Sequence, residues 1–345
     1  MTLKRYVVSR ILLAIPTILI LLTTIFFLTH IIPGDPVRAL VGDEASEEVV
    51  ENLREKLGFN RPLLVQYIDY ITGLLKGDLG ITVLRARVSY VNRSEAVTVA
   101  SMIRERFPTT IELSILAWVL SLLTGVITGV VSAMNEGKIV DHLLRLFFLF
   151  LYSLPLFVIG IFLQLTLGVY FRMFPIFGRY SEAFRMNPIT GFLLLDNLIV
   201  GNFTGFLDGL HHLILPSVTL AAYYSGLMSR LSRSEMIKAL NRMFCLVAEA
   251  KGLKKRTIAF RHALRNAALP IFTLSGLQVT SLLTGSILVE TIFSLNGLAS
   301  LFVYAAKLRD YMLIQGCVTV FALIAVIIGI LVDIGYYFLD PRVRY

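Results

Sequence analysis

The sequence predicts an all-α polytopic membrane protein with six transmembrane helices. Hydrophobic residues make up 56% of the 345 residues and charged residues only 16%, and the mean hydropathy of +0.77 is far above that of a soluble domain. Several apolar runs are long enough to cross a hydrocarbon core of about 30 Å at about 1.5 Å per residue. Basic residues gather in one loop between such runs, which is typical of cytoplasmic loops.

The first apolar run, Ile11–Thr29, follows a basic start that contains Lys4, Arg5 and Arg10. A signal peptide would have a shorter apolar middle and a small-residue cleavage site after it, and no such site follows this run. We therefore expect residues 1–32 to form a cytosolic N-terminal tail and an uncleaved first transmembrane helix.

Residues 33–110 are polar and mixed in charge, which predicts an external region after the first helix. Within it, acidic residues and leucines at helical spacing indicate an amphipathic helix at Glu47–Leu57. The apolar stretch Leu63–Leu75 is too short to cross the membrane and contains Asp69. The sequon Asn92-Arg93-Ser94 is consistent with an external position.

Residues 111–338 hold five further spans. We expect them at Ile111–Ala133, about Leu143–Phe171, about Leu213–Met228, Leu269–Thr291 and Met312–Phe338. Pro155 falls inside the third span, where its ring and missing N–H should produce a kink. A second external segment runs to His212, and Ile292–Tyr311 forms a re-entrant or surface piece. Six spans return both termini to the cytosol, with residues 339–345 as a short tail.

The loop at residues 231–268 carries most of the excess positive charge. Between residues 230 and 265 there are ten Lys and Arg against two acids, a net charge of +8 out of +9 for the chain. Such concentration follows the positive-inside rule and argues against a nucleic-acid-binding surface. An amphipathic helix resting on anionic lipid headgroups would have the same composition, so membrane lipid is an expected partner.

Several motifs in this chain resemble one family of membrane proteins. In the basic loop Ala248, Ala250, Lys251, Gly252 and Leu253 precede R-H-A-L-R-N-A at residues 261–267 and then Leu269-Pro270. This pattern resembles the EAA loop of ABC importer permeases, in the form found in the peptide subfamily. I-P-G-D-P at residues 32–36, G-D-L-G at residues 77–80 and D-P-R at residues 340–342 are also similar to that subfamily. The chain is identified as a member of the dipeptide/oligopeptide (peptide/nickel) permease family, first-permease (B) type.

The resemblance implies the membrane permease subunit of an ATP-driven importer, with no enzymatic activity of its own. In that family the EAA loop forms a coupling helix that docks into a cleft of a cytoplasmic ATPase. Carried over to this chain, the coupling residues are Ala248, Glu249, Ala250, Lys251, Gly252 and Leu253. The implied partners are a homologous second permease, two cytoplasmic ATPases and an external substrate-binding protein. The implied substrates are di- or oligopeptides, while oligosaccharides and nickel stay open because similar permeases carry them.

The sequence also indicates that this chain does not itself supply the energy for transport. No G-x-x-x-x-G-K-[ST] motif occurs, so ATP must be bound by partner subunits and we expect no cofactor here. Ionisable residues lie toward the ends of the spans, which disfavours a proton- or sodium-driven carrier. Gly252 permits a backbone reversal that other residues resist. A membrane scaffold that recruits an ATPase without transport remains the alternative from another class.

The fifth span carries a stripe of hydroxyl groups. On a helical wheel Thr273, Thr280 and Thr284 lie close together, with Ser281 beside them and Gln278 on one flank. Such a stripe can line a wet passage without the cost of a charge, and it can equally allow close helix packing. Both interpretations stay open at this point.

Overall fold

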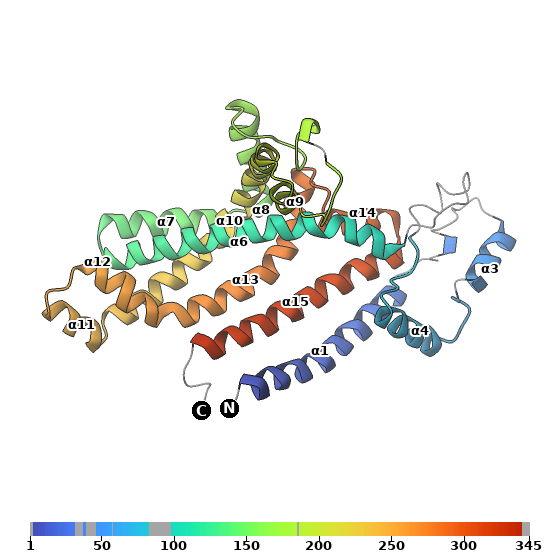
Figure 1. Cartoon of the computed structure of the whole chain (residues 1–345), viewed down its shortest axis with the longest axis horizontal. Helices are drawn as coiled ribbons and strands as arrows, with labels where there is room; N and C mark the ends of the chain where they lie inside the picture. The colour runs from blue at the N-terminus through green and yellow to red at the C-terminus, as the bar shows by residue number, and fades with distance from the viewer. Residues whose placement is uncertain are drawn as a thin grey trace. The chain divides into compact units, whose positions relative to one another are not determined.

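The structure is a computed structural model that describes residues 3–31, 37–38, 46–56, 58–82, 98–184 and 186–339 (Figure 1). These residues are helical almost throughout, and the one β-contact among them is an isolated antiparallel bridge between Ile81 and Thr98. The predicted all-α class is therefore confirmed for the described part of the chain. Three sequence features lie outside the described residues: the I-P-G-D-P segment, the Asn92 sequon and the D-P-R tail.

The described helices divide between two compact units. Unit 1 comprises Met1–Arg10, Thr109–Leu295 and Ile327–Tyr345, and unit 2 comprises Ile11–Pro108 and Asn296–Val326. The helices are α1 (Leu3–Ile31), α3 (Glu47–Lys56), α4 (Leu63–Leu75), α6 (Val99–Met134), α7 (Ile139–Ser153), α8 (Leu156–Leu163), α9 (Leu193–Ile199), α10 (Phe203–Leu240), α11 (Met243–Ala250), α12 (Lys255–Thr257), α13 (Leu264–Ile292), α14 (Leu298–Leu308) and α15 (Tyr311–Leu339). One π-helical segment, Gln164–Tyr170, continues α8, and another, Ile258–Ala263, joins α12 to α13.

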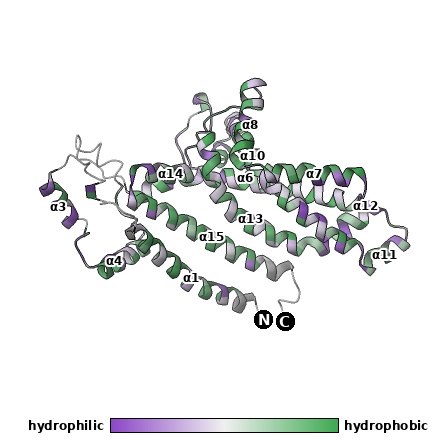
Figure 2. Ribbon diagram, turned by 180° about the vertical axis from the view of Figure 1, so that it is seen from behind, coloured by the Kyte–Doolittle hydropathy of each residue, from purple (hydrophilic) through white to green (hydrophobic). Residues whose placement is uncertain are grey.

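Four described helices are long and apolar enough to cross a membrane, or five if one bent pair counts as a span. The four are Val7–Thr29, Val99–Met134, Lys255–Ile292 and Tyr311–Gly335, and the bent pair is Ile139–Ser153 with Leu156–Tyr170. Figure 2 shows the apolar colouring along α1, α13 and α15. Five of the six predicted spans thus have a counterpart. The fourth predicted span, Leu213–Met228, falls inside α10, which is long enough to cross a membrane but is less apolar than the other four helices.

The composition of α10 follows from its surroundings. This helix packs against α7, α8, α9 and α13, and its buried residues include Ser217, Thr219 and Ser225. Thr219 donates its hydroxyl hydrogen to the Leu215 carbonyl, 2.9 Å away, so the side chain needs no outside partner. A membrane helix that packs against other helices can carry polar residues on the sides that face them, which lowers the mean hydropathy of α10.

The predicted kink at Pro155 is confirmed, and it is a full break. Helix α7 ends at Ser153, Leu154 has an extended backbone, and α8 begins after Pro155. The two helices are bent by 102° relative to each other. Proline disfavours helical conformation in the residue before it, so Leu154 is where the chain must turn.

Close packing and one buried ion pair join α6, α7 and α10 in unit 1. A Cβ on Gly125 or Gly129 of α6 would lie 2.6 Å from Met228 or 2.5 Å from Ser232, so only glycine allows α10 to approach this closely. Asp141 at the start of α7 is fully buried and accepts from Arg233 of α10, with Nε–Oδ1 at 2.7 Å and Nη2–Oδ2 at 2.8 Å. This bidentate pair fixes the register of α7 against α10.

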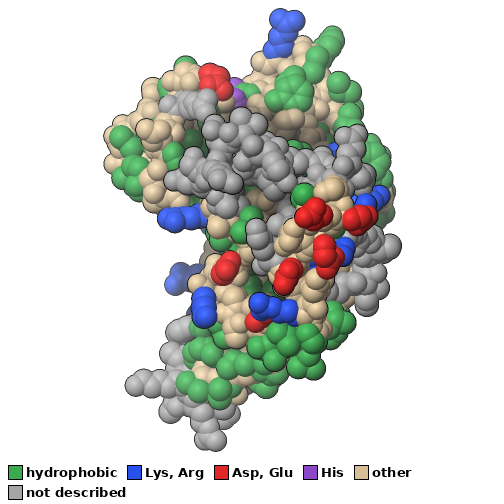
Figure 3. Space-filling model, turned by 90° about the vertical axis from the view of Figure 1, so that its right-hand side faces the viewer, with side chains coloured by type: hydrophobic (Ala, Val, Ile, Leu, Met, Phe, Trp, Pro, Cys, Tyr) green, Lys and Arg blue, Asp and Glu red, His purple; other side chains and the backbone are tan. Residues whose placement is uncertain are grey.

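Unit 2 contains the amphipathic helix predicted for the external region, which is confirmed as α3. The short apolar stretch Leu63–Leu75, for which no secondary structure was predicted, forms the helix α4. The phenol of Tyr70 on α4 lies 2.9 Å from the Thr319 hydroxyl on α15, and buried Thr82 donates to the Asp310 carboxylate at 2.6 Å. Figure 3 shows acidic and basic side chains gathered on one face, beside a broad apolar patch.

Candidate functional site: an exposed helix and an open groove

Helix α11 stands within the predicted coupling segment, between α10 and α12 in the chain. At its end the Gly252 N–H donates to the Glu249 carbonyl at 2.8 Å, and the Leu253 N–H donates to the Ala248 carbonyl at 3.2 Å. These two bonds form a Schellman motif, which requires a left-handed residue after the helix. Gly252 has φ +78° and meets this requirement. The predicted backbone reversal at Gly252 is confirmed.

Only one narrow edge of α11 packs against the protein. Cys245 and Ala248, three residues apart, are buried in a cluster with Met236 and Ala239 of α10 and Ile258 of the following π-helical segment. Burial raises the pKa of the Cys245 thiol, as expected for a small packing residue rather than a reactive one. Ala248 therefore faces the protein's own core and is not part of an accessible surface.

The remaining surface of α11 is open and partly apolar. Met243, Leu246 and Val247 are 73%, 49% and 45% exposed, and Leu253 after the helix is 40% exposed. Figure 2 shows hydrophilic residues around α12, directly after this apolar surface in the chain. A short helix with this much exposed apolar side chain is typical of a surface that another protein or the membrane covers.

The other predicted coupling residues lie on this open surface. Glu249, Ala250, Lys251 and Gly252 are all exposed. A Cβ added to Gly252 would meet no atom within 4 Å, so the space beside the turn is free. We call Met243, Leu246, Val247, Glu249, Ala250, Lys251, Gly252 and Leu253 the α11 surface.

A second feature of unit 1 is an open groove with a volume of about 630 Å³. The break between α7 and α8 forms one wall of the groove. Helices α10 and α13 form the other walls. Tyr152 and Tyr223 stack with ring centroids 5.2 Å apart, and Tyr224 meets Tyr223 edge to face at 5.1 Å. The Tyr224 hydroxyl donates to the Ser281 carbonyl at 2.7 Å, which ties α10 to α13 at the groove.

The residues of the predicted hydroxyl stripe in the fifth span lie in different surroundings in the structure. Ser281 and Thr284 line the groove and are exposed. Gln278 is buried and donates its amide hydrogen to the Tyr224 carbonyl at 2.8 Å, so it packs α13 against α10. Thr273 returns its hydroxyl to the Leu269 carbonyl at 2.9 Å. Neither Thr273 nor Thr280 is among the residues that line this groove.

The tyrosines at residues 152, 223 and 224 were not identified from the sequence. Their signal was present in the Tyr223-Tyr224 pair inside an apolar run, but only tertiary packing brings Tyr152 of α7 beside them. Two exposed leucines, Leu277 and Leu288, continue the face of α13 that carries Ser281 and Thr284. Spacings of three and four residues place all four on one side of the helix.

The groove holds neutral polar groups among apolar ones. Ser153, Ser281, Thr284 and the tyrosine hydroxyls offer hydrogen bonds, and no acid or base lines it. Among the described residues no group of three or more His, Cys, Asp or Glu could hold a metal ion. The groove can therefore offer hydrogen bonds and apolar contacts to a bound molecule, but no charge.

Several apolar helices long enough to cross a membrane, together with an open groove lined by hydroxyl groups, fit a multi-pass membrane transport protein. Comparison with known proteins gives the family. The family description "Binding-protein-dependent transport system inner membrane component" matches residues 125–345, and its N-terminal counterpart matches residues 3–114. The chain belongs to this family of ABC transporter permeases, which are multi-pass membrane proteins, and the resemblance seen in the motifs is confirmed.

Relatives of known role match over nearly the full length. The chain is 36% identical over 345 residues to the dipeptide transport system permease protein DppB of Escherichia coli (strain K12), covering 99% of both chains. It is 34% identical over 341 residues to the di/tripeptide transport system permease protein DppB of Pseudomonas aeruginosa (strain UCBPP-PA14), covering 99% of this chain and 98% of the relative. It is 32% identical over 340 residues to the glutathione transport system permease protein GsiC of Shigella flexneri serotype 5b (strain 8401), covering 99% of both.

Proposed function

We propose that this chain forms half of the translocation path of an ATP-driven peptide importer and couples that path to cytoplasmic ATPases through the α11 surface. The observation that carries the proposal is the direct connection between the two features. Helix α11 follows α10 in the chain and precedes α13, and these are two of the helices that line the groove. A displacement of α11 would therefore be passed through short connections to α10 and α13, and so to two walls of the groove.

The proposed topology has six spans, with α10 as the fourth and with α7 and the segment after Pro155 as the third. The N-terminus, the loop with α11, and the tail then lie on the cytosolic side, in agreement with the basic charge of that loop. In this arrangement residues 33–110 are external and residues 111–338 form the permease core. The coupling loop, residues 231–268, is the cytosolic part of that core.

Coupling needs a partner that covers the α11 surface. Its exposed apolar residues would lose contact with water on docking, at about 25 cal/mol per Å² of apolar area removed. Glu249 is exposed and has no ion pair within the described residues, so its carboxylate is available to a cation on the ATPase. The ATPases would bind ATP, and this chain would supply no catalytic residue and no cofactor.

Peptides are the proposed cargo. The named relatives support this choice, because their names specify dipeptides, di- and tripeptides and glutathione. The groove supports it too, since neutral hydroxyls can bond peptide groups while Leu288 and the tyrosine rings accept varied side chains. A homologous second permease would close the open side of the groove, and an external binding protein would deliver the peptide.

The proposed mechanism is a population shift between two states of the permease pair. Closure of the two ATPases on ATP would draw the α11 surfaces together and favour one state, and ATP hydrolysis would release them. The groove would then face the external side in one state and the cytosol in the other.

The experiment is purification of the tagged chain from mildly solubilised membranes, followed by mass spectrometry and peptide uptake. We expect two ATPases, a sister permease and a binding protein to copurify, and vesicles with the full set to take up dipeptides in proportion to ATP hydrolysed. Recovery of ATPases with no uptake of any peptide, sugar or nickel would support the scaffold alternative instead.

A further inference from the structure

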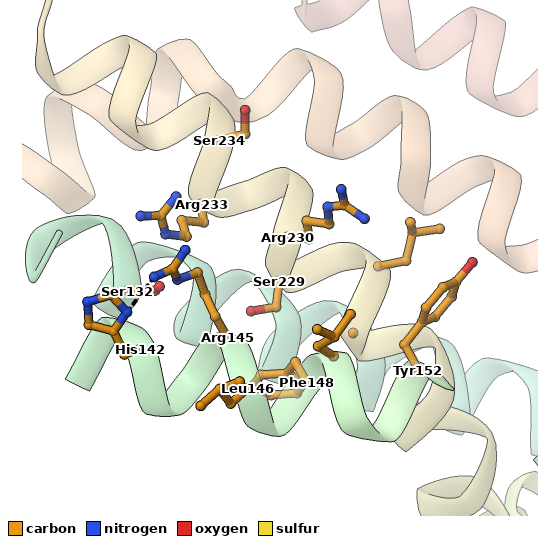
Figure 4. Close-up of a pocket in the computed structure, with 13 residues that line it drawn as sticks. Ser132, His142, Arg145, Leu146, Phe148, Tyr152, Ser229, Arg230, Arg233 and Ser234 are labelled. Carbon is orange, nitrogen blue, oxygen red and sulfur yellow. Dashed lines mark hydrogen bonds between the residues drawn. The ribbon is translucent and has the colours of Figure 1, made fainter. Parts of the chain in front are cut away.

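Unit 1 contains a second hollow of about 630 Å³, between α7 and the part of α10 that leads to α11. Figure 4 shows the side chains that line it. Arg145 projects from α7, and Arg230 and Arg233 project from α10. No Asp or Glu is among the lining residues. The hollow is therefore basic, whereas the groove described above is neutral.

The three arginines are not fully compensated by acids. Asp141 holds Arg233 in the bidentate pair described above, and its Oδ1 lies 3.6 Å from Nε of Arg145. Glu136, which is 55% exposed, lies 4.0 Å from Arg233. Arg230 is exposed and has no ion pair among the residues that the structure describes. Three cations against two acids leave at least one positive charge for a ligand.

The chemistry of the hollow changes along its length. Near the start of α7 it is lined by His142 and Arg145, and seven residues further on it reaches Tyr152, about 10 Å away at 1.5 Å per residue. Leu146 and Leu149 form the flank between these ends, and they are 63% and 56% exposed. A ligand that fits this shape carries an anion at one end and an apolar chain at the other.

We propose that this hollow binds an anionic phospholipid of the cytosolic leaflet, with its headgroup at the end lined by Arg145, Arg230 and Arg233 and an acyl chain along Leu146 and Leu149. Guanidinium groups bind phosphate oxygens through paired hydrogen bonds. Basic hollows between membrane helices on the cytosolic side suit anionic headgroups. The proposal rests on the topology proposed above, which places this end of α7 and α10 on the cytosolic side, and it is independent of which solute the chain transports.

The test compares lipid retention by the full chain and by two charge-matched variants. Arg145→Gln with Arg230→Gln removes two cations from the hollow and leaves the structural Asp141–Arg233 pair intact. Arg104→Gln with Arg172→Gln removes two exposed cations elsewhere. Native mass spectrometry of each protein, extracted from membranes that contain phosphatidylglycerol, counts the lipids that stay bound.

We expect at least one phosphatidylglycerol per chain to stay with the unchanged protein and with the Arg104/Arg172 variant, and retention to fall at least about fivefold in the Arg145/Arg230 variant. Adding phosphatidylcholine to delipidated protein should not restore an adduct, whereas phosphatidylglycerol should. Inorganic phosphate at millimolar concentration should displace little of it, because phosphate makes no contact with the apolar flank.

Equal retention by both variants would overturn the proposal. Displacement of the lipid by inorganic phosphate would also overturn it and indicate a site for small anions, and displacement by a dipeptide would overturn it and indicate a site for peptides. Arg230→Glu serves as a second variant if the double variant does not insert. Arg230 has no ion pair to lose in the described part of the chain, so a drop in retention there reports the ligand and not the fold. Dipeptide uptake measured alongside separates loss of lipid from failure of the transport function.

Discussion

Helices α9 and α11 are two short helices of unit 1 that end in the same way and are held in opposite ways. After α9 the Gly201 N–H donates to the Leu198 carbonyl at 3.1 Å and the Asn202 N–H to the Asn197 carbonyl at 2.8 Å. This is the Schellman motif that also closes α11. Gly201 has φ +72°, and like Gly252 it has no atom within 4 Å of an added Cβ.

Hydrogen bonds to neighbouring segments hold α9 in place. Asp196 is 1% exposed and accepts hydrogen bonds from the backbone N–H groups of Ile189, Thr190 and Gly191, at 2.9 to 3.1 Å. At the start of the helix the Leu194 N–H donates to Glu112 of α6 at 2.8 Å. These hydrogen bonds to Asp196 and Glu112 tie α9 to the preceding turn and to α6.

Helix α11 has no such fastening. Among the described residues, the buried side chains of α11 are those of Cys245 and Ala248, and its other side chains are exposed. The same hydrogen-bond pattern therefore ends both helices. Helix α9 is held by hydrogen bonds to neighbouring segments, whereas most side chains of α11 are exposed. The difference lies in what surrounds each helix, so the proposed coupling function would depend on the exposed residues of the α11 surface and not on the end geometry that the two helices share.

The largest expected effect comes from an acid at the open glycine of α11. Gly252→Asp places an L-residue in the left-handed region, at a cost of about 1 to 2 kcal/mol, and adds an unpaired anion to the docking surface. We expect ATP-driven uptake to fall below detection while membrane insertion is unchanged, measured by vesicle uptake and by yield in the membrane fraction.

Gly201→Asp is the matched control for that variant. It carries the same backbone strain at an equally open turn after α9, so we expect uptake within about twofold of the unchanged protein. Comparable losses of uptake in the two variants would show that backbone strain, rather than docking, explains the effect at Gly252.

The second effect concerns two leucines of similar exposure, one on each helix. Leu246 of α11 and Leu198 of α9 are 49% and 51% exposed. Leu246→Ala should weaken retention of the ATPases about tenfold, because truncating a buried apolar anchor of an interface costs more than about 1 kcal/mol. Leu198→Ala should leave retention unchanged. Retention is measured by quantitative mass spectrometry after affinity purification, and unchanged retention in the Leu246 variant would remove this residue from the docking surface.

The third effect is expected in α9, where a substitution should lower stability and leave ATPase retention unchanged. Asp196→Ala leaves the N–H groups of the 189–191 turn without their acceptor, and losing bonds to a charged group costs about 1.5 to 3 kcal/mol. We expect a lower thermal unfolding midpoint and faster hydrogen exchange at residues 189–191, with ATPase retention intact. Loss of retention with an unchanged midpoint would mean that the two helices are coupled in a way that their packing does not suggest.

The smallest effect is on pH dependence. Burial raises the pKa of Asp196, but hydrogen bonds from Thr190, Ile189 and Gly191 outweigh it, so the net shift of the pKa is downward from 3.8. A lowered folded pKa gives stability that is present above the ordinary pKa and is lost as the pH falls through the folded value. Hydrogen-exchange protection at residues 189–191 should therefore be constant from pH 7 to about pH 5 and fall only below about pH 4. Loss of protection already at pH 6 would contradict this assignment.

Features that depend on a few neighbouring residues followed from the sequence alone. The apolar runs indicated most of the spans, because apolar length is a local property and the membrane has a fixed thickness. Pro155 predicted the break in the third span and Gly252 the reversal after α11, because proline and glycine act on their own backbone. The motif around Glu249 was sufficient to indicate the family, which the full-length relatives then confirmed.

Only the tertiary structure decided which side each residue faces and which helices meet. It separated Ser281 and Thr284, which line the groove, from Gln278, which packs against Tyr224, although all three belong to one predicted stripe. It turned Ala248 inward and left Leu246 open. It also paired Asp141 with Arg233 across 92 residues of chain. The physical reason is the same in each case: a side chain's role depends on neighbours that packing supplies from distant parts of the sequence, and periodicity within one helix carries no information about them.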